Sequence, residues 1–321
     1  MSAPDTPPPG SPSGAHGKAA GERAGAHGLA FFAMAVIATT FPVGDLIADS
    51  GDPAVLMFIR FAMASVLFTP IMIWRYGLHW PGFGALARYG VVAAAAVGFF
   101  WTMFEALKTT DSLNTSAIST TIPAFTALFA AILVRERMGW RRLVALGIGM
   151  LGALWVIFRG DPERLVTLDL SYGDWLFFPG CASMGLYAAL IRRMHRGEPV
   201  LVMSFWFTIM TAFWLLIIAN VKIVDIDWAA VDGAVLGGLA WLAVGPSITT
   251  FFLVQMTTLK IGATRVQAYT YFIPALVLLM DWALGRGLPS LMTLPGIAIV
   301  IAASLLIQRG VIYEGRQSAA K

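Results

Sequence analysis

Residues 106–125, with the sequence ALKTTDSLNTSAISTTIPAF, decide the fold because a related stretch returns in the second half of the chain. Residues 258–276 read TLKIGATRVQAYTYFIPAL and align with the first stretch once one residue is deleted before the proline. Both stretches have a Leu-Lys pair near the start and a Pro-Ala pair near the end. An internal repeat of this kind indicates an architecture of two equivalent halves.

The composition indicates an integral membrane protein. Of the 321 residues, 58% are hydrophobic and only 12% are charged, and the mean hydropathy is +0.75. Soluble domains carry about 25% charged residues, so the composition excludes a soluble enzyme. The single cysteine, Cys181, excludes an intramolecular disulfide framework and a multi-cysteine metal site. We therefore expect no metal and no cofactor.

Ten stretches are long and apolar enough to cross a bilayer as helices, since about 20 apolar residues span the roughly 30 Å of hydrocarbon. Five helices fall in each half, and because five is odd, the second half must enter the membrane with opposite polarity. Such an inverted-topology repeat is typical of carriers that use alternating access around a site near the bilayer midplane. The predicted spans are residues 28–47, 53–74, 87–107, 112–134, 139–158, 173–193, 199–220, 234–258, 262–284 and 289–308.

The spans divide the chain into two units and two tails. Residues 1–27 form an expected disordered cytoplasmic tail, because they contain five prolines within the first twelve positions and cannot bury enough apolar surface. Residues 28–158 form the first five-helix repeat and residues 173–309 the second. Residues 159–172 connect them on the outer side, and residues 310–321 form a second cytoplasmic tail.

The basic residues predict the orientation in the membrane. With both termini inside, 16 of the 22 lysines and arginines fall on the cytoplasmic side, five fall outside, and Arg60 lies within a span. An excess of lysine and arginine marks the cytoplasmic side of a membrane protein. We therefore predict a multi-pass protein of the cell inner membrane with both termini in the cytoplasm. The net charge of +4 then reflects topology and not a nucleic acid partner. The expected partners are the lipid bilayer and a small-molecule substrate, and the sequence carries no signal of an oligomeric state.

One long run resembles a known transporter family. Residues 106–152, ALKTTDSLNTSAISTTIPAFTALFAAILVRERMGWRRLVALGIGMLG, closely resemble the EamA-type domain of the drug/metabolite transporter superfamily. Asp52-Pro53 followed by Arg60-Phe61 resembles the same family in the second span. The resemblance extends over about residues 28–309 and is stronger in the first half. It implies a ten-helix transporter of small metabolites, very often an exporter of amino acids or related compounds.

Two polar faces that end in a proline are the leading candidates for the substrate site. Each proline frees the carbonyl four residues earlier and should kink its helix, and in a bilayer such a break is tolerated mainly where protein or a water-filled cavity meets it. We predict that the two faces oppose each other across a central cavity; the alternative is that small residues only allow close helix packing. The faces are Ser116, Ser119, Thr120 and Pro123 in the fourth span, and Gln267, Thr270, Tyr271 and Pro274 in the ninth.

Aromatic and polar residues elsewhere could complete the site. Trp101 and Glu105 share a face of the third span, where the ring could form a wall and the carboxylate could bind an ammonium group or a proton. The alternative is an ordinary pair at the membrane interface, where Trp is enriched. Further candidates, each of which could instead serve packing or lie at a helix end, are Tyr187, Trp241, Gln255 and Asp281.

Arg60 is the charged residue that lies deepest in a predicted span. It follows Pro53 by seven residues, about 10 Å along a helix. A charge at this depth is costly in lipid, so it should face protein and have a partner. Asp45, near the outer end of the first span, is the expected partner. Arg60 could bind a carboxylate in the substrate site or form a structural ion pair.

These features favour a secondary transporter that exports small metabolites such as amino acids by alternating access. The chain contains no P-loop, so an ion gradient or the substrate gradient must supply the energy. One alternative is an intramembrane enzyme acting on a lipid or isoprenoid, which the placement of all four histidines outside the spans disfavours. The other is a membrane scaffold without transport, for which the expected tails are short.

Overall fold

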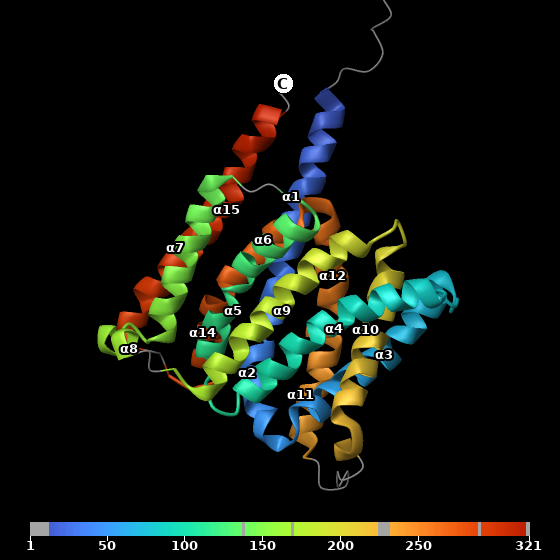
Figure 1. The fold of residues 1–321 in the computed structure, drawn as a ribbon, viewed down its shortest axis with the longest axis horizontal. Helices are drawn as coiled ribbons and strands as arrows, with labels where there is room; N and C mark the ends of the chain where they lie inside the picture. Colours follow the sequence, from blue (N-terminus) through green and yellow to red (C-terminus); the bar gives the residue numbers. More distant parts are fainter. Residues whose placement is uncertain (1–12, 137–138, 168–169, 224–231, 288–289, 319–321) are drawn as a thin grey trace, which may run out of the picture.

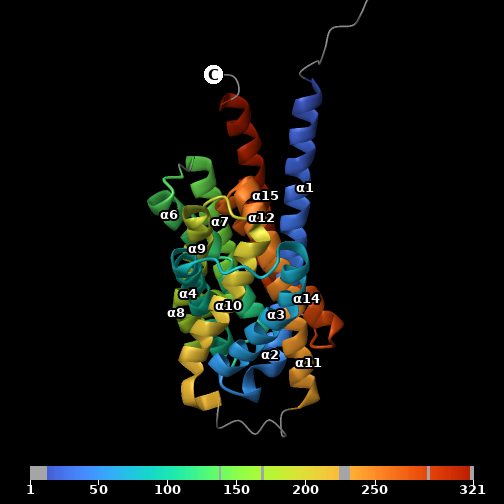
Figure 2. The same cartoon turned by 90° about the vertical axis from the view of Figure 1, so that its right-hand side faces the viewer.

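The structure, a computed structural model, describes residues 13–136, 139–167, 170–223, 232–287 and 290–318 (Figure 1). These residues form a bundle of helices, and no strand occurs among them. α1 (Ser13–Ala38) begins and α15 (Leu294–Ser318) ends at the same end of the bundle (Figure 2). Following the orientation predicted from the basic residues, we call this the inner end and the opposite end the outer end.

Eight helices of the described chain are long and apolar enough to cross a membrane, and they coincide with eight of the ten predicted spans. The fifth and tenth predicted spans coincide with shorter apolar helices, Leu143–Ile157 and Leu291–Leu306. The prediction of a multi-pass helical membrane protein is therefore confirmed.

Each half of the chain is a run of helices with short connections, and some spans are divided into two segments. In the first half the remaining helices are α2 (Thr40–Ile47), α3 (Pro53–Tyr76), α4 (Phe83–Ala106), α5 (Ser112–Ser119), α6 (Ile122–Leu133) and α7 (Trp140–Ile157). The short α8 (Pro162–Thr167) lies in the connection between the halves. In the second half they are α9 (Tyr172–Met194), α10 (Val200–Ala219), α11 (Gly233–Leu242), α12 (Thr250–Ile261), α13 (Ala263–Gln267) and α14 (Ile273–Ala283).

Helices extend into both expected tails. α1 begins at Ser13 and includes residues 13–27 of the first one. The last proline of this region is Pro12, and alanine, the strongest helix former, is frequent after it. At the other end α15 runs to Ser318, well into the expected second tail. Residues 1–12 lie outside the described part of the chain.

Acidic residues between the spans determine where several helices begin. Asp52 accepts a hydrogen bond from the backbone N–H of Ala54 at 2.9 Å and so caps α3, and Asp111 caps α5 through the N–H of Asn114 at 2.7 Å. Asp232 caps α11 in the same way. A carboxylate at this position satisfies a free N–H and complements the positive end of the helix dipole.

The packing pattern repeats between the two halves. α1 packs against α12, and α9, the equivalent of α1, packs against α4, the equivalent of α12. α3 packs against its own equivalent α10, and α7 packs against α15. Figure 1 shows α1 running away from the inner end and α9 running toward it. The contacts therefore fit an approximate twofold relation between halves of opposite direction.

Candidate functional site

The fourth span is broken just before Pro123. α5 and α6 lie on either side of Thr120 and Thr121, because proline lacks the N–H that would continue the helix. The hydroxyls of these threonines donate to the carbonyls of Ala117 and Ile118, at 2.6 and 2.8 Å. The same carbonyls also accept the backbone N–H groups of Thr120 and Thr121, so the hydroxyls add a second bond to each carbonyl where the chain leaves regular helical geometry.

The ninth span is broken at the equivalent place. Ala268–Phe272 forms a 3₁₀ helix between α13 and α14 and ends just before Pro274. The Thr270 hydroxyl donates to the carbonyl of Gln267 at 2.7 Å. α6 contacts both α13 and the 3₁₀ segment, so the two broken helices pack against each other.

A third irregular segment lies in the eighth span. Ala243–Thr249 forms a π-helix around Pro246, and the Ser247 hydroxyl donates to the carbonyl of Leu242, five residues earlier, at 3.0 Å. π-helical turns are rare and often mark functional sites. Neither Pro246 nor Ser247 is among the predicted site residues, although a proline inside an apolar span is a signal of such a break.

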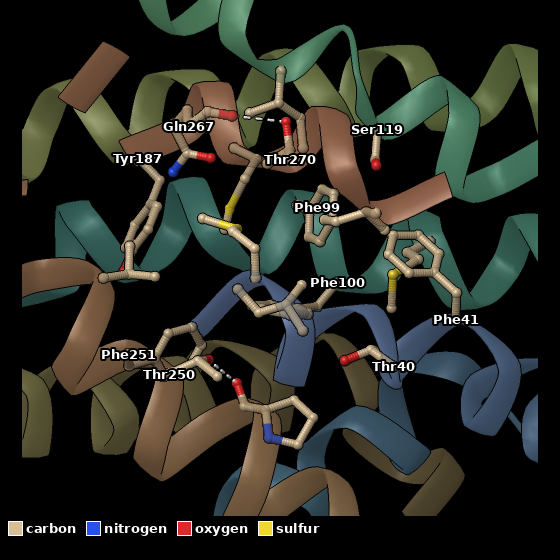
Figure 3. A pocket seen from close by; sticks show the side chains of 18 of the residues that line it. Thr40, Phe41, Phe99, Phe100, Ser119, Tyr187, Thr250, Phe251, Gln267 and Thr270 are labelled. Carbon is tan, nitrogen blue, oxygen red and sulfur yellow. Dashed lines mark hydrogen bonds between the residues drawn. The ribbon is translucent and has the colours of Figure 1, made fainter. Parts of the chain in front are cut away.

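The irregular segments enclose a cavity between the two halves (Figure 3). Its volume, taken as the space open to the centre of a water molecule, is about 40 Å³. The wall is mainly apolar, because aromatic, methionine and aliphatic side chains form most of it, and it also carries a few hydroxyl and amide groups and the guanidinium of Arg60. The labelled residues are Thr40, Phe41, Phe99, Phe100, Ser119, Tyr187, Thr250, Phe251, Gln267 and Thr270.

The cavity brings together several predicted site residues from both halves, namely Arg60, Ser119, Tyr187, Gln267 and Thr270. The other members of the two polar faces lie elsewhere. Ser116 and Thr120 are buried outside the lining, and Tyr271 packs against Gly149 of α7. In each face, some residues therefore line the cavity and others pack between helices, so both of the alternatives considered for the faces apply.

Trp101 and Glu105 do not reach this cavity. Trp101 packs against Ala54, Val55 and Ala219 near the outer end. Glu105 accepts a hydrogen bond from Lys108, three residues along, at 3.2 Å. The third span presents Phe99, Phe100 and Met103 to the cavity instead. Hydropathy alone does not reveal which face of this helix is turned toward the cavity, because both faces carry aromatic residues.

Of the four further candidates, Tyr187 lines the cavity and the other three make other contacts. The indole N–H of Trp241 donates to the Thr39 hydroxyl at 3.0 Å, on the surface of the bundle. Gln255 is buried and accepts a hydrogen bond from Ser204 at 2.6 Å. Asp281 lies at the outer end, where it contacts Arg286. None of the three is in the cavity lining.

Arg60 is fully buried and lines the cavity. Its Nε donates to the Ser247 hydroxyl at 3.0 Å, and its guanidinium carbon lies 5.2 and 5.0 Å from the ring centres of Phe61 and Phe100. The expected ion pair with Asp45 is wrong. Asp45 lies toward the outer end of the first span and is bonded to Arg286 of the second half.

A group of four side chains, the outer cluster, joins the halves at the outer end. Arg286 bonds Asp45 and lies 3.3 Å from Asp281, and the Ser112 hydroxyl donates to Asp281 at 2.6 Å. Asp45 follows the cavity residue Phe41 by four residues, about 6 Å along a helix. The outer cluster therefore lies one turn outside the cavity.

The inner end has contacts between the halves as well. Arg192 Nη1 lies 2.9 Å from Glu136 Oε2, and His27 Nδ1 lies 2.9 Å from the Tyr269 hydroxyl. Phe31 packs edge-on against Phe272 at 5.4 Å between ring centres. Bonds thus join the halves on both sides of the cavity.

Two carboxylates in the connectors have perturbed pKa values. Burial alone would raise the pKa of Asp52, but hydrogen bonds from Lys222 and from the N–H of Ala54 hold it below the ordinary value. Burial likewise opposes ionisation of Glu198, and its backbone hydrogen bond from Arg196 together with the charge of Arg88 lowers the pKa. The lowered pKa values favour the charged carboxylates, which bond Lys222 after α10 and Arg88 of α4.

The comparisons with known proteins agree with this architecture. The EamA-like transporter family matches residues 25–158 and 171–309, one match in each half. The uncharacterized transporter YyaM of Bacillus subtilis is 23% identical over 255 residues, which cover 79% of this chain and 83% of that relative. The S-adenosylmethionine uptake transporter of Rickettsia felis is 23% identical over 192 residues, with 60% of this chain and 61% of that relative covered.

A solved structure shows the same fold. A protein of known crystal structure superposes with a TM-score of 0.67 at 17% sequence identity, and the match covers 88% of this chain and 96% of that one. At this identity the likeness concerns the fold alone.

Proposed function

Because this chain belongs to the EamA-like transporter family, we propose that it is a secondary transporter that carries a small metabolite through the cavity between its halves by alternating access. The observation that carries the proposal is the position of the cavity. Ser119 and Thr270, each four residues before the proline of its half, both line it. A site shared by equivalent helix breaks can open to one end of the bundle when the halves tilt one way and to the other when they tilt back.

We interpret the structure as an occluded state of this proposed cycle. Cavities that hold small ligands measure about 300–1,000 Å³, and the volume of about 40 Å³ holds only a few water molecules. The halves are bonded to each other on both sides of it through Arg286 and Glu136. The cavity must therefore widen to accept a substrate. Pro123, Pro274 and the π-helix are the proposed hinges, because the regular backbone bonds are already interrupted there.

The aromatic wall favours substrates with an apolar or aromatic body. Phe41, Phe99, Phe100 and Phe251 supply apolar surface, and Gln267 supplies an amide near one end. Amino acids and related metabolites fit this mixture, and the relative that takes up S-adenosylmethionine carries a molecule with an amino-acid group. We propose amino-acid-like metabolites as substrates and export across the plasma membrane as the physiological direction.

A matched pair of cysteine variants tests the site. Ser119→Cys places a thiol in the cavity, and Ser116→Cys places one on the same helix outside the lining. The purified proteins are reconstituted and assayed for release of a labelled amino-acid mixture, with and without a pH gradient. We expect a thiol reagent to inactivate Ser119→Cys, with the transported amino acid slowing the inactivation. Native Cys181 is buried, so the wild type is the second control.

Two results would contradict the proposal. The first is no release of any amino acid by correctly inserted wild-type protein, which removes amino acids as the substrate class. The second is equal inactivation of both cysteine variants without protection by substrate, which places the pathway elsewhere.

A further inference from the structure

The charge of Arg60 has no counter-charge in the structure. Among the described residues no acid lies within ion-pairing distance of its guanidinium, and the side chain has no exposed surface outside the bundle. Asp45, the partner expected from the sequence, is engaged by Arg286. A buried charge is costly unless it is paired. Arg60 is therefore a candidate binding group for an anion that is not part of the chain.

Neutral groups hold the guanidinium in place without neutralising it. Its described contacts are the Ser247 hydroxyl, the Met57 sulfur at 3.8 Å and the rings of Phe61 and Phe100. A guanidinium has five N–H donors, and these contacts use the Nε and Nη1 groups. Aromatic faces stabilise a cation, but they leave donors available for an anionic oxygen.

Other polar atoms of the lining also have no partner. Gln267 is 2% exposed, and its Nε2 makes no hydrogen bond to the described residues. The Tyr187 hydroxyl lies near Gln255 but makes no aligned hydrogen bond, and the Thr40 hydroxyl has no partner either. Buried polar groups are normally hydrogen-bonded. A ligand in the cavity would supply the missing partners from both halves.

The charge of the lining distinguishes between classes of ligand. Arg60 is the one charged side chain among the lining residues, so the cavity carries a single positive charge and no carboxylate. We propose that Arg60 binds the carboxylate of the transported amino-acid-like substrate and that, among ligands of one skeleton, the site binds a net monoanion more tightly than the zwitterion or a cation. The proposal rests on the transport function given above and specifies the chemistry of the same site. A monoanion neutralises the cavity, whereas the ammonium group of a zwitterion meets only neutral acceptors and the arginine.

Three ligands of the same skeleton test this preference: 3-phenylpropanoate, its uncharged amide 3-phenylpropanamide, and the zwitterion phenylalanine. A second series with the skeleton of 4-methylpentanoate, its amide and leucine replaces the ring by an aliphatic body. Binding to the purified full-length protein is measured by calorimetry. In at least one series we expect the carboxylate to bind most tightly, the zwitterion less tightly and the amide least.

Arg60→Gln should remove the preference for the carboxylate. A hydrogen bond to a charged group of this kind corresponds to about 10- to 150-fold in affinity, so carboxylate binding should fall by this factor while amide binding stays the same. Arg60→Lys should retain part of the preference. Gln267→Leu leaves Arg60 in place and should weaken carboxylate binding severalfold, which keeps the test open if Arg60→Gln does not fold.

The outcomes separate this proposal from the transport function. Equal binding of carboxylate and amide in both series, or no binding of either, overturns the role of Arg60. An unchanged preference in a folded Arg60→Gln variant does the same, and unchanged carboxylate affinity in Gln267→Leu places the carboxylate elsewhere. Preference for the carboxylate without transport in proteoliposomes supports the binding site and counts against the transport function. Amino-acid transport that Arg60→Gln does not alter supports the function and removes the anion site.

Discussion

The outer cluster is expected to hold the outer end closed, and Arg286 is its centre because it contacts an acid of each half. Arg286→Gln removes both charge pairs, with Asp45 and with Asp281. Only the pair with Asp45 joins the two halves, and a partly exposed ion pair contributes about 0.2–1 kcal/mol, so its loss removes up to about 1 kcal/mol from the closed state. This corresponds to about a fivefold change in the ratio of closed to open molecules at 25 °C.

The assay is the rate at which a membrane-impermeant thiol reagent, added from the outer side, modifies a cysteine at Ser119. The rate should rise about fivefold when Arg286→Gln is added, since modification requires the outer end to open. Arg159→Gln is the matched control, because Arg159 of the connector pairs at 2.6 Å with Asp111 of the first half. The reasoning is refuted if Arg286→Gln leaves the rate unchanged or lowers it, or if the control raises the rate equally.

Two further predictions concern stability and are measured by thermal unfolding of the purified protein. Gly185→Ala should destabilise the protein by about 1–3 kcal/mol, since the added Cβ would lie 2.6 Å from the Cβ of Phe125. Gly147→Ala should be neutral or stabilising, because no atom lies within 4 Å of the added Cβ. Equal effects of the two variants would argue against close packing of α6 and α9. Asp52→Asn retains a helix cap but loses the ion pair with Lys222. Because the pKa of Asp52 in the folded protein lies below its ordinary value of 3.8, the wild type should be more stable than this variant at neutral pH. This advantage should disappear as the pH falls below 3.8 through the folded pKa, and an advantage that persists there would contradict the assignment.

The spans and the repeat could be predicted from the sequence because they depend on local properties. Hydropathy over about 20 residues locates a helix in lipid wherever it packs, and eight of the predicted spans coincide with helices of sufficient length. Pro123 and Pro274 mark the broken helices because a missing N–H acts on the same turn. The acids Asp52 and Asp111 cap the helices that follow them for the same local reason.

The composition of the site depends on the rotation of each helix about its axis, which only the packing of the whole bundle determines. The third span has aromatic residues on two faces, and the contacts of α4 with α9 and α10 direct Phe100 to the cavity and leave Trp101 outside it. The bonding partner of a charged side chain likewise depends on contacts between residues that are far apart in the sequence. Arg60 meets Ser247, 187 residues away, and Asp45 meets Arg286, 241 residues away. A local sequence pattern cannot identify partners that are so far apart in the chain. The sequence alone therefore determined the helices and their order, and the tertiary structure decided which side chains face the cavity.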